Sequence, residues 1–183
     1  MTKQTQKKKA VATDPPVETI HYAIGLCRYG SVLCATSKKG ICAIYIHDKP
    51  KTLLATLKKD FPATKIQGAK KDFKPVLASV IKYIKKPNGK PEVKLDLHGT
   101  EFQKRVWKFL STIRAGKTLS YSEVAMHLGS PGAARTVGNA CAANKIAILI
   151  PCHRVLRLDG SLSGYRWGLK IKKELLKNEN AIP

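Results

Sequence analysis

The sequence predicts a small α/β domain over residues 17–97, followed by a mainly α domain over residues 98–183 that contains a helix-turn-helix. Short β-rich runs precede two helical apolar patterns in the first half, and two helices flank a glycine-containing turn in the second. A chain of 183 residues can bury one large core or two small ones. The composition, 43% hydrophobic and 25% charged, is that of an ordinary globular protein, and no apolar run reaches the roughly 20 residues that span a bilayer.

Residues 1–16 are polar and lysine-rich and end in a Pro-Pro pair, which predicts a disordered basic tail. No apolar signal core follows this tail, so no export signal is expected. Three β-rich runs come next and are separated by short turns, a spacing typical of an antiparallel meander. These runs are Thr19–Gly25, Ser31–Ala35 and Gly40–His47.

Two later segments of the first domain carry apolar residues three and four positions apart, which is typical of amphipathic helices. They are Thr52–Phe61 and Phe73–Lys85. A Pro- and Gly-containing loop over residues 87–91 ends the second helix, and the alternation in Val93–Leu97 predicts a further strand. This domain shows no catalytic constellation.

The second domain begins with strong helix signals. Thr100 is placed to cap a helix over residues 101–112. Ser120 begins a second helix, which ends near residue 128, and Glu123 completes its capping box. A third helix over residues 133–143 has mostly small side chains, apart from Arg135. The last two helices predict a helix-turn-helix whose small side chains allow close approach to DNA, although a tightly packed core helix is an alternative.

The chain is strongly basic, with a formal net charge of +22 from 34 Lys and Arg against 12 Asp and Glu. Such a surface attracts polyanions, although a lysine-rich proteome would produce the same excess. The arginines are more informative, because planar guanidinium groups suit phosphate and base recognition and are concentrated in the second half. Only Arg28 precedes residue 100, and the others are Arg105, Arg114, Arg135, Arg154, Arg157 and Arg166.

The five cysteines include no CxxC pair, and with no export signal they indicate reduced thiols and a cytoplasmic location. A zinc site built from His21, Cys27, Cys34 and Cys42 is conceivable. These cysteines lie in apolar, strand-like segments, however, so neither a metal nor another cofactor is expected.

The apolar run Ile146–Ile150, predicted as a strand, leads into Pro151-Cys152-His153-Arg154-Val155. A thiolate is a strong nucleophile, and a neighbouring base can generate it. A buried structural cysteine beside an incidental histidine is the plainer interpretation of such a dipeptide. Asn144 before the run and the glycine-rich residues 160–165 after it favour a reactive site.

This segment, with Asn144 before it and Gly164-Tyr165-Arg166-Trp167-Gly168 after it, resembles the signature of the O6-alkylguanine-DNA alkyltransferases, above all their bacterial adaptive-response branch. The similarity extends over almost the whole chain, from about Ile20 to Glu179. It implies a ribonuclease H-like first domain and a winged-helix-like second domain. It also implies a single-turnover transfer of the alkyl group from O6-alkylguanine in DNA, with O4-alkylthymine as a further substrate, to Cys152 after nucleotide flipping.

The resemblance implies catalytic roles for five residues. Cys152 would accept the alkyl group, and His153 would remove the thiol proton through a bound water. Glu179 would hold and polarise His153, which predicts a thiolate fraction above that of a free cysteine, whose pKa is about 8.5. Asn144 would brace the turn before the reactive segment. Tyr121 would donate a proton to the departing guanine, which is otherwise a poor leaving group.

The resemblance also implies how DNA is held. Arg135 would fill the gap left by the flipped nucleotide, from a helix that contacts the minor groove through Ala133, Ala134 and Thr136. The base pocket would be lined by Val155, Ser163, Gly164 and Tyr165. Because the product is a thioether, which water does not hydrolyse, the protein would act once.

The expected partner is double-stranded DNA containing O6-alkylguanine, bound by a monomer, with no membrane partner. The adaptive-response protein has a further N-terminal metal-binding half, whereas here a tail of 16 residues precedes the matching region. Neither phosphotriester repair nor transcriptional control is therefore expected. Two rival interpretations stay open: a non-catalytic DNA-binding module in which Cys152 is a core thiol, and a cysteine hydrolase of unrelated fold.

Overall fold

The computed structural model describes residues 17–69, 73–87 and 93–183, so the predicted tail and most of the predicted loop at 87–91 lie outside the described residues. The predicted antiparallel meander is confirmed as β1 (Thr19–Cys27), β2 (Gly30–Thr36) and β3 (Ile41–His47). A fourth strand, β4 (Lys65–Gly68), pairs in parallel with β1 and was not predicted. The sheet is therefore mixed rather than antiparallel, with the order β3-β2-β1-β4.

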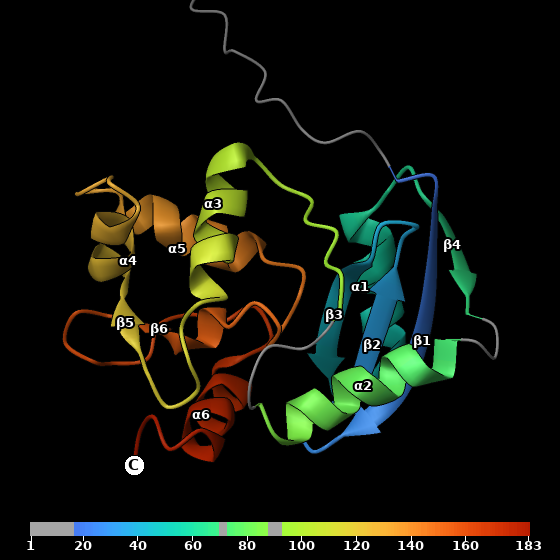
Figure 1. Ribbon diagram of the computed structural model, residues 1–183. Helices are drawn as coiled ribbons and strands as arrows, with labels where there is room; N and C mark the ends of the chain where they lie inside the picture. The colour runs from blue at the N-terminus through green and yellow to red at the C-terminus, as the bar shows by residue number, and fades with distance from the viewer. Residues whose placement is uncertain (1–16, 70–72, 88–92) are drawn as a thin grey trace, which may run out of the picture.

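The sheet is covered by a helix on each face, α1 (Pro50–Asp60) on one and α2 (Lys74–Lys85) on the other (Figure 1). Successive side chains of the central strands point to opposite faces of the sheet. Leu33 packs in the apolar cluster that includes α1, whereas Val32 packs in the cluster that includes α2. Residues on both faces must then be apolar, which explains the near-continuous apolar runs of β2 and β3. The cluster on the α2 face continues into the second half of the chain, so one core joins both halves.

Residues 93–97 form a single bridge, between Leu95 and Ile41, instead of the predicted strand. The backbone of Ile41 bonds to both Lys94 and Asp96, after which the chain leaves the sheet and runs to α3 (Glu101–Leu110). This crossing is possible because Gly40 has a φ of +148°, and a Cβ at this position would lie 2.3 Å from the Lys94 carbonyl oxygen.

The second half is mainly helical (Figure 1) and contains α3, α4 (Tyr121–His127), α5 (Ala134–Ala143) and α6 (Leu169–Asn178). Both predicted N-caps are confirmed. Thr100 and Ser120 each form a capping box, with Gln103 and Glu123 respectively. Helices α4 and α5 form the predicted helix-turn-helix. Beside them a parallel pair, β5 (Leu119–Ser120) and β6 (Val155–Leu156), was not predicted.

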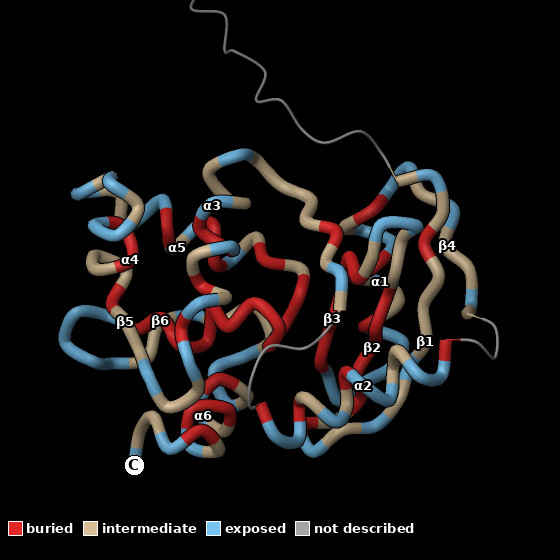
Figure 2. The backbone as a smooth tube through the Cα atoms, in the orientation of Figure 1, coloured by how far each residue is buried: buried red, intermediate tan, exposed pale blue. Residues whose placement is uncertain are grey.

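The predicted strand Ile146–Ile150 is instead a buried turn. Its isolated β-bridges among the described residues join Ile146 to Ile44 and Ala147 to Ile150, and Ile148 has a left-handed φ of 67°. Every residue from 146 to 156 is buried, and Figure 2 shows this segment as a continuous buried stretch near the middle of the molecule. An apolar run therefore correctly indicated burial but not conformation.

Replacing Gly40 by alanine tests the crossing between the sheet and the linker to α3. We expect Gly40→Ala to lower the free energy of unfolding by about 2–4 kcal/mol, because the new Cβ meets the Lys94 carbonyl in a backbone conformation that alanine rarely adopts. Urea denaturation measures the loss. The control is Gly68→Ala, where a Cβ meets nothing within 4 Å and a change within about 0.5 kcal/mol is expected. Equal stabilities of the two variants would contradict this interpretation.

Candidate active site

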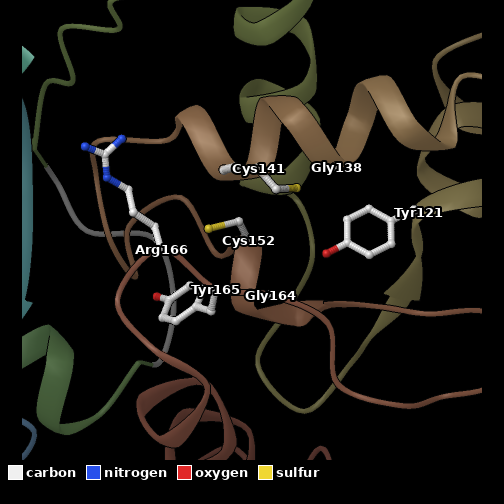
Figure 3. A pocket seen from close by; sticks show the side chains of 8 residues that line it. Tyr121, Gly138, Cys141, Cys152, Gly164, Tyr165 and Arg166 are labelled. Carbon is white, nitrogen blue, oxygen red and sulfur yellow. The ribbon is translucent and has the colours of Figure 1, made fainter.

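A cavity of about 340 Å³ opens beside the Cys152 thiol, between α5, the 3-10 turn η2 (Cys152–Arg154) and the loop before α6 (Figure 3). This volume lies in the usual range for small-molecule pockets, roughly 300–1,000 Å³. The lining is mostly small or aromatic and comprises Tyr121, Gly138, Cys141, Ala142, Cys152, Gly164, Tyr165 and Arg166. The structure therefore brings the predicted Cys152, Tyr121, Gly164 and Tyr165 around one cavity.

Asn144 shapes the turn that leads to the thiol. Its Oδ1 accepts from the Ile146 amide at 2.8 Å, while its Nδ2 lies 3.2 Å from the Ile146 carbonyl oxygen and 3.1 Å from that of Ile150. The same Nδ2 is 3.2 Å from Cys152 Sγ. One buried amide thus ties both ends of the turn together and contacts the nucleophile, which supports the bracing role predicted for it.

The Cys152 thiol is 3% exposed, and burial raises its pKa above the ordinary value. The Asn144 hydrogen bond and the Lys172 charge oppose this effect but do not cancel it. The predicted excess of thiolate over a free cysteine is therefore wrong for the resting protein. The thiol is protonated at neutral pH, so a base is needed when it reacts.

His153, the predicted base, follows the thiol directly in the chain. Its Nε2 lies 2.9 Å from Glu179 Oε1, and both side chains are fully buried. Burial lowers the His153 pKa, although Glu179 favours the charged form, so the ring is neutral. A neutral ring that donates from Nε2 to the carboxylate keeps a lone pair on Nδ1. That nitrogen is buried and has no hydrogen-bond partner among the described residues.

Arg154 completes this arrangement, a role that the sequence did not reveal. Its Nε and Nη2 donate to the two oxygens of Glu179, each at 2.8 Å, and its Nη1 donates to the Ile113 carbonyl. Burial by itself raises the pKa of the Glu179 carboxyl, but the hydrogen bonds and charges of His153 and Arg154 lower it to about 2. The carboxylate is therefore charged throughout the neutral range.

The opposite wall of the cavity carries a second hydrogen-bonded group. Tyr121 Oη lies 2.6 Å from Ser163 Oγ. Behind them, Lys172 Nζ donates to the Val155 carbonyl at 2.7 Å and lies 3.1 Å from Ser163 Oγ. Lys172 is fully buried, and burial lowers its pKa to about 8. It was not predicted, although it shares the face of α6 that buries Leu175 and Leu176, where a lysine is unexpected.

Arg166 joins the cavity to the first domain. Its guanidinium pairs with Asp60 at the end of α1 and lies over the rings of Tyr45 and Trp167. Tyr45 Oη donates to the same aspartate at 2.6 Å. The loop that carries the pocket residues is therefore held against the sheet.

The residues predicted to contact DNA lie outside the cavity. Arg135 and Thr136 are exposed at the start of α5, and Ala133 and Ala134 are half-buried. Gly138, Cys141 and Ala142 of the same helix line the cavity, although they were not predicted to. Val155 is buried behind the cavity and contributes its carbonyl to Lys172 rather than its side chain to the lining.

Within residues 17–69, 73–87 and 93–183, no three His, Cys, Asp or Glu side chains are grouped so that they could hold a metal ion. All five cysteines are free thiols. In the same part of the chain, no helix has the length and apolar character needed to cross a membrane.

Comparison with known proteins agrees with this geometry. Residues 101–181 match the model of the 6-O-methylguanine DNA methyltransferase, DNA binding domain family. The methylated-DNA–protein-cysteine methyltransferase of Debaryomyces hansenii is 36% identical over 173 residues, which cover 86% of this chain and 90% of that protein. The chain belongs to this methyltransferase family.

Two further relatives extend the comparison. The bifunctional transcriptional activator/DNA repair enzyme Ada of Escherichia coli is 45% identical over 160 residues, or 87% of this chain and 45% of Ada. The chain thus spans about half the length of the first curated methyltransferase relatives that it matches. The O6-methylguanine methyltransferase of Mycobacterium tuberculosis, solved in complex with DNA, superposes with a TM-score of 0.71 at 33% identity, covering 88% of this chain and 93% of that one.

Glu179→Gln tests the buried carboxylate. We expect the free energy of unfolding at pH 7 to fall by about 3–5 kcal/mol, because Arg154 keeps a buried charge without its partner. Glu179 has a lowered pKa, so its stabilisation is complete above the unfolded carboxyl pKa, about 4.3, and disappears as the pH falls toward about 2. The difference in the free energy of unfolding between the parent protein and Glu179→Gln should therefore decrease as the pH falls over this range.

Urea denaturation at several pH values provides the measurement. The control is Glu101→Gln, which alters an exposed carboxylate paired with Lys104 and should cost less than about 1 kcal/mol. A Glu179→Gln loss as small as that of the control, or one independent of pH between 5 and 2.5, would show that the carboxylate does not hold this site together.

Proposed function

We propose that this protein repairs alkylated DNA directly, by moving the alkyl group from O6 of guanine to Sγ of Cys152 in a single turnover. The observation that carries the proposal is a buried thiol lining a cavity of base-binding size, followed directly in the chain by a neutral His153 whose Nδ1 has no partner among the described residues. Family membership supports the same chemistry. O4-alkylthymine, which offers a similar exocyclic alkoxy group, is a second substrate under this proposal.

The nucleophile is generated on demand. His153 Nδ1 takes the thiol proton, through a water, and Glu179 stabilises the imidazolium that forms. Sulfur then attacks the saturated alkyl carbon while the bond from that carbon to O6 breaks, and the electron pair stays on guanine. Tyr121, which reaches the same cavity, gives its hydroxyl proton to the departing base. The thioether on Cys152 is not hydrolysed, so the protein is consumed.

DNA is held by the second domain. A base inside a duplex must leave the stack to reach a cavity of this kind, so the nucleotide is flipped and the gap is filled. Under this proposal Arg135 fills the gap, from a helix lying in the minor groove with Ala133, Ala134 and Thr136 against the backbone, and the exposure of Arg135 at the start of α5 supports this role. The net charge of +22 favours phosphate binding by a monomer.

The same reasoning extends to the fold. We infer that the first domain is ribonuclease H-like and that the second is winged-helix-like. The parallel pair β5–β6 beside the helix-turn-helix supports the second assignment.

Mass spectrometry on duplex DNA containing O6-methylguanine tests the transfer. We expect the protein to gain one methyl group, about 14 Da, located by peptide mapping on Cys152, and Cys152→Ala to gain none while binding DNA within a few-fold of the parent. Cys141→Ala, which alters the other thiol of the cavity, should still accept the methyl group. Methylation of Cys141 in the parent protein, or tight DNA binding without any transfer, would overturn the assignment.

Arg135→Ala tests the flipping role. We expect transfer from duplex to slow by about tenfold or more, since unstacking a base costs a few kcal/mol, and transfer from a single strand to slow much less. Arg114→Ala removes an exposed arginine outside α4 and α5 and serves as the matched control. Equal slowing on both substrates would remove Arg135 from the extrusion step.

A further inference from the structure

Lys172 is a buried cation that the chemistry above does not use. Its side chain is fully enclosed at the base of the cavity wall, and the oxygens that its ammonium meets among the described residues are neutral ones, those of Val155 and Ser163. The ionisable groups that act on it are the thiols Cys141 on α5 and Cys152 on η2. Burying an ammonium without an anionic partner is costly, so a structural role alone explains this lysine poorly.

The hydrogen bonds around Ser163 allow a consistent direction of donation. An ammonium only donates, so Ser163 Oγ accepts from Lys172 Nζ, at 3.1 Å. The serine hydrogen is available for Tyr121 Oη, at 2.6 Å, and the lowering effect of this bond on the Tyr121 pKa is that of a bond donated to the phenol oxygen. Because Tyr121 accepts this bond, its own hydrogen is free to point into the cavity that its hydroxyl faces (Figure 3).

We propose that Ser163 and Lys172 form a proton relay behind Tyr121, which orients the phenol hydrogen toward the base and replaces the proton that Tyr121 gives away. This inference rests on the proposed alkyl transfer. Tyr121 touches the departing base, whereas Ser163 and Lys172 act through it as positioning residues.

Each proton in the proposed step has an origin and a destination. As the bond from the alkyl carbon to O6 breaks, the Tyr121 hydroxyl proton goes to guanine. The Ser163 hydroxyl proton passes to Tyr121, and an ammonium proton of Lys172 passes to Ser163. Lys172 ends neutral, and His153 ends as an imidazolium that carries the former thiol proton. The net charge of the site is unchanged, and no further reactant is needed.

The acidities of Tyr121 and Lys172, the two ends of the relay, favour proton transfer from the lysine toward the tyrosine. Burial raises the pKa of Tyr121 above its ordinary value, in spite of the Ser163 hydrogen bond, so a phenolate left in the cavity would be unstable. The charges that act on this phenol come from Cys141, Cys152 and Arg157. The Lys172 ammonium, with a pKa of about 8, is the stronger acid and can neutralise the phenolate.

The test is the pH dependence of the single-turnover rate, measured between pH 6 and 9.5 with saturating duplex containing O6-methylguanine. The parent rate should fall about tenfold per pH unit above pH 8, where Lys172 loses its proton. Ser163→Ala leaves the lysine bonded to the carbonyls of residues 155 and 163, so the loop stays braced. This variant should be about tenfold slower at pH 7, and the fall near pH 8 should be absent.

Two more variants sharpen the result. Lys172→Arg keeps a buried donor but has no proton to lose in this range, so it should also lack the fall near pH 8. In a Tyr121→Phe background, Ser163→Ala should cause no further loss of rate, because the two act as one unit. The control is Ser161→Ala, an exposed hydroxyl in the same loop, which should stay within twofold of the parent at every pH.

The outcomes separate the relay from the proposed function. Transfer to Cys152 with an unshifted fall near pH 8 in Ser163→Ala overturns the relay alone, as does a rate that is lowered equally at every pH. No transfer by the parent protein overturns the proposed function, and the relay with it. The relay is established if the rate of Ser163→Ala does not fall near pH 8 and if Ser163→Ala causes no further loss of rate in the Tyr121→Phe background. This conclusion holds even if Lys172→Arg does not fold.

Discussion

The carboxylate of Glu179 is buried at the end of α6, where it accepts hydrogen bonds from both His153 and Arg154 of the turn that carries the thiol. A buried charge is stable only while its partners are in place, so the position of α6 and the conformation of this turn are interdependent. The same bond fixes the histidine tautomer, because the ring must donate from Nε2. Its other nitrogen is then the acceptor, which is the state that the proposed mechanism requires.

The proposed mechanism handles protons at two places. Under it, His153, held by Glu179, removes the thiol proton, while Tyr121, which lines the cavity, donates to the leaving group. Between them, the thiol is kept protonated by burial. A protein that reacts once gains little from a permanently charged thiolate, which would be exposed to oxidants. A buried thiol, activated when a substrate fills the cavity, is consistent with single use.

The sequence predicted those features that depend on neighbouring residues. The N-caps at Thr100 and Ser120, and the capping box of Ser120 with Glu123, were predicted correctly because the cap and its partner lie within three residues of each other. The run Ile146–Ile150 was misassigned because an apolar segment suits a buried strand and a buried turn equally, and the Asn144 hydrogen bonds that hold the turn depend on the folded backbone. The strands β4, β5 and β6, of four residues or fewer, give almost no periodic signal.

For the site as well, features that depend on residues distant in the sequence were missed. Cys152, His153 and Glu179 were predicted as site residues from the family resemblance, and the structure brings the last two into contact across 26 positions. The roles of Arg154 and Lys172 depend on partners far away in the sequence, so they were missed. The thiol pKa was predicted in the wrong direction, because the histidine next to it in the sequence was visible and the enclosing core was not.

The protonation state of His153 is the most direct test of this arrangement. The ¹⁵N NMR spectrum of protein labelled in its histidines, assigned by comparison with a His153→Gln variant, reports each ring nitrogen separately. At pH 7 we expect a neutral ring with a protonated Nε2 and an unprotonated Nδ1, because Glu179 accepts from Nε2 and burial disfavours the imidazolium. A protonated Nδ1, in either the opposite tautomer or the imidazolium, would leave His153 without the lone pair that the proposed mechanism needs to accept the thiol proton, and would contradict it.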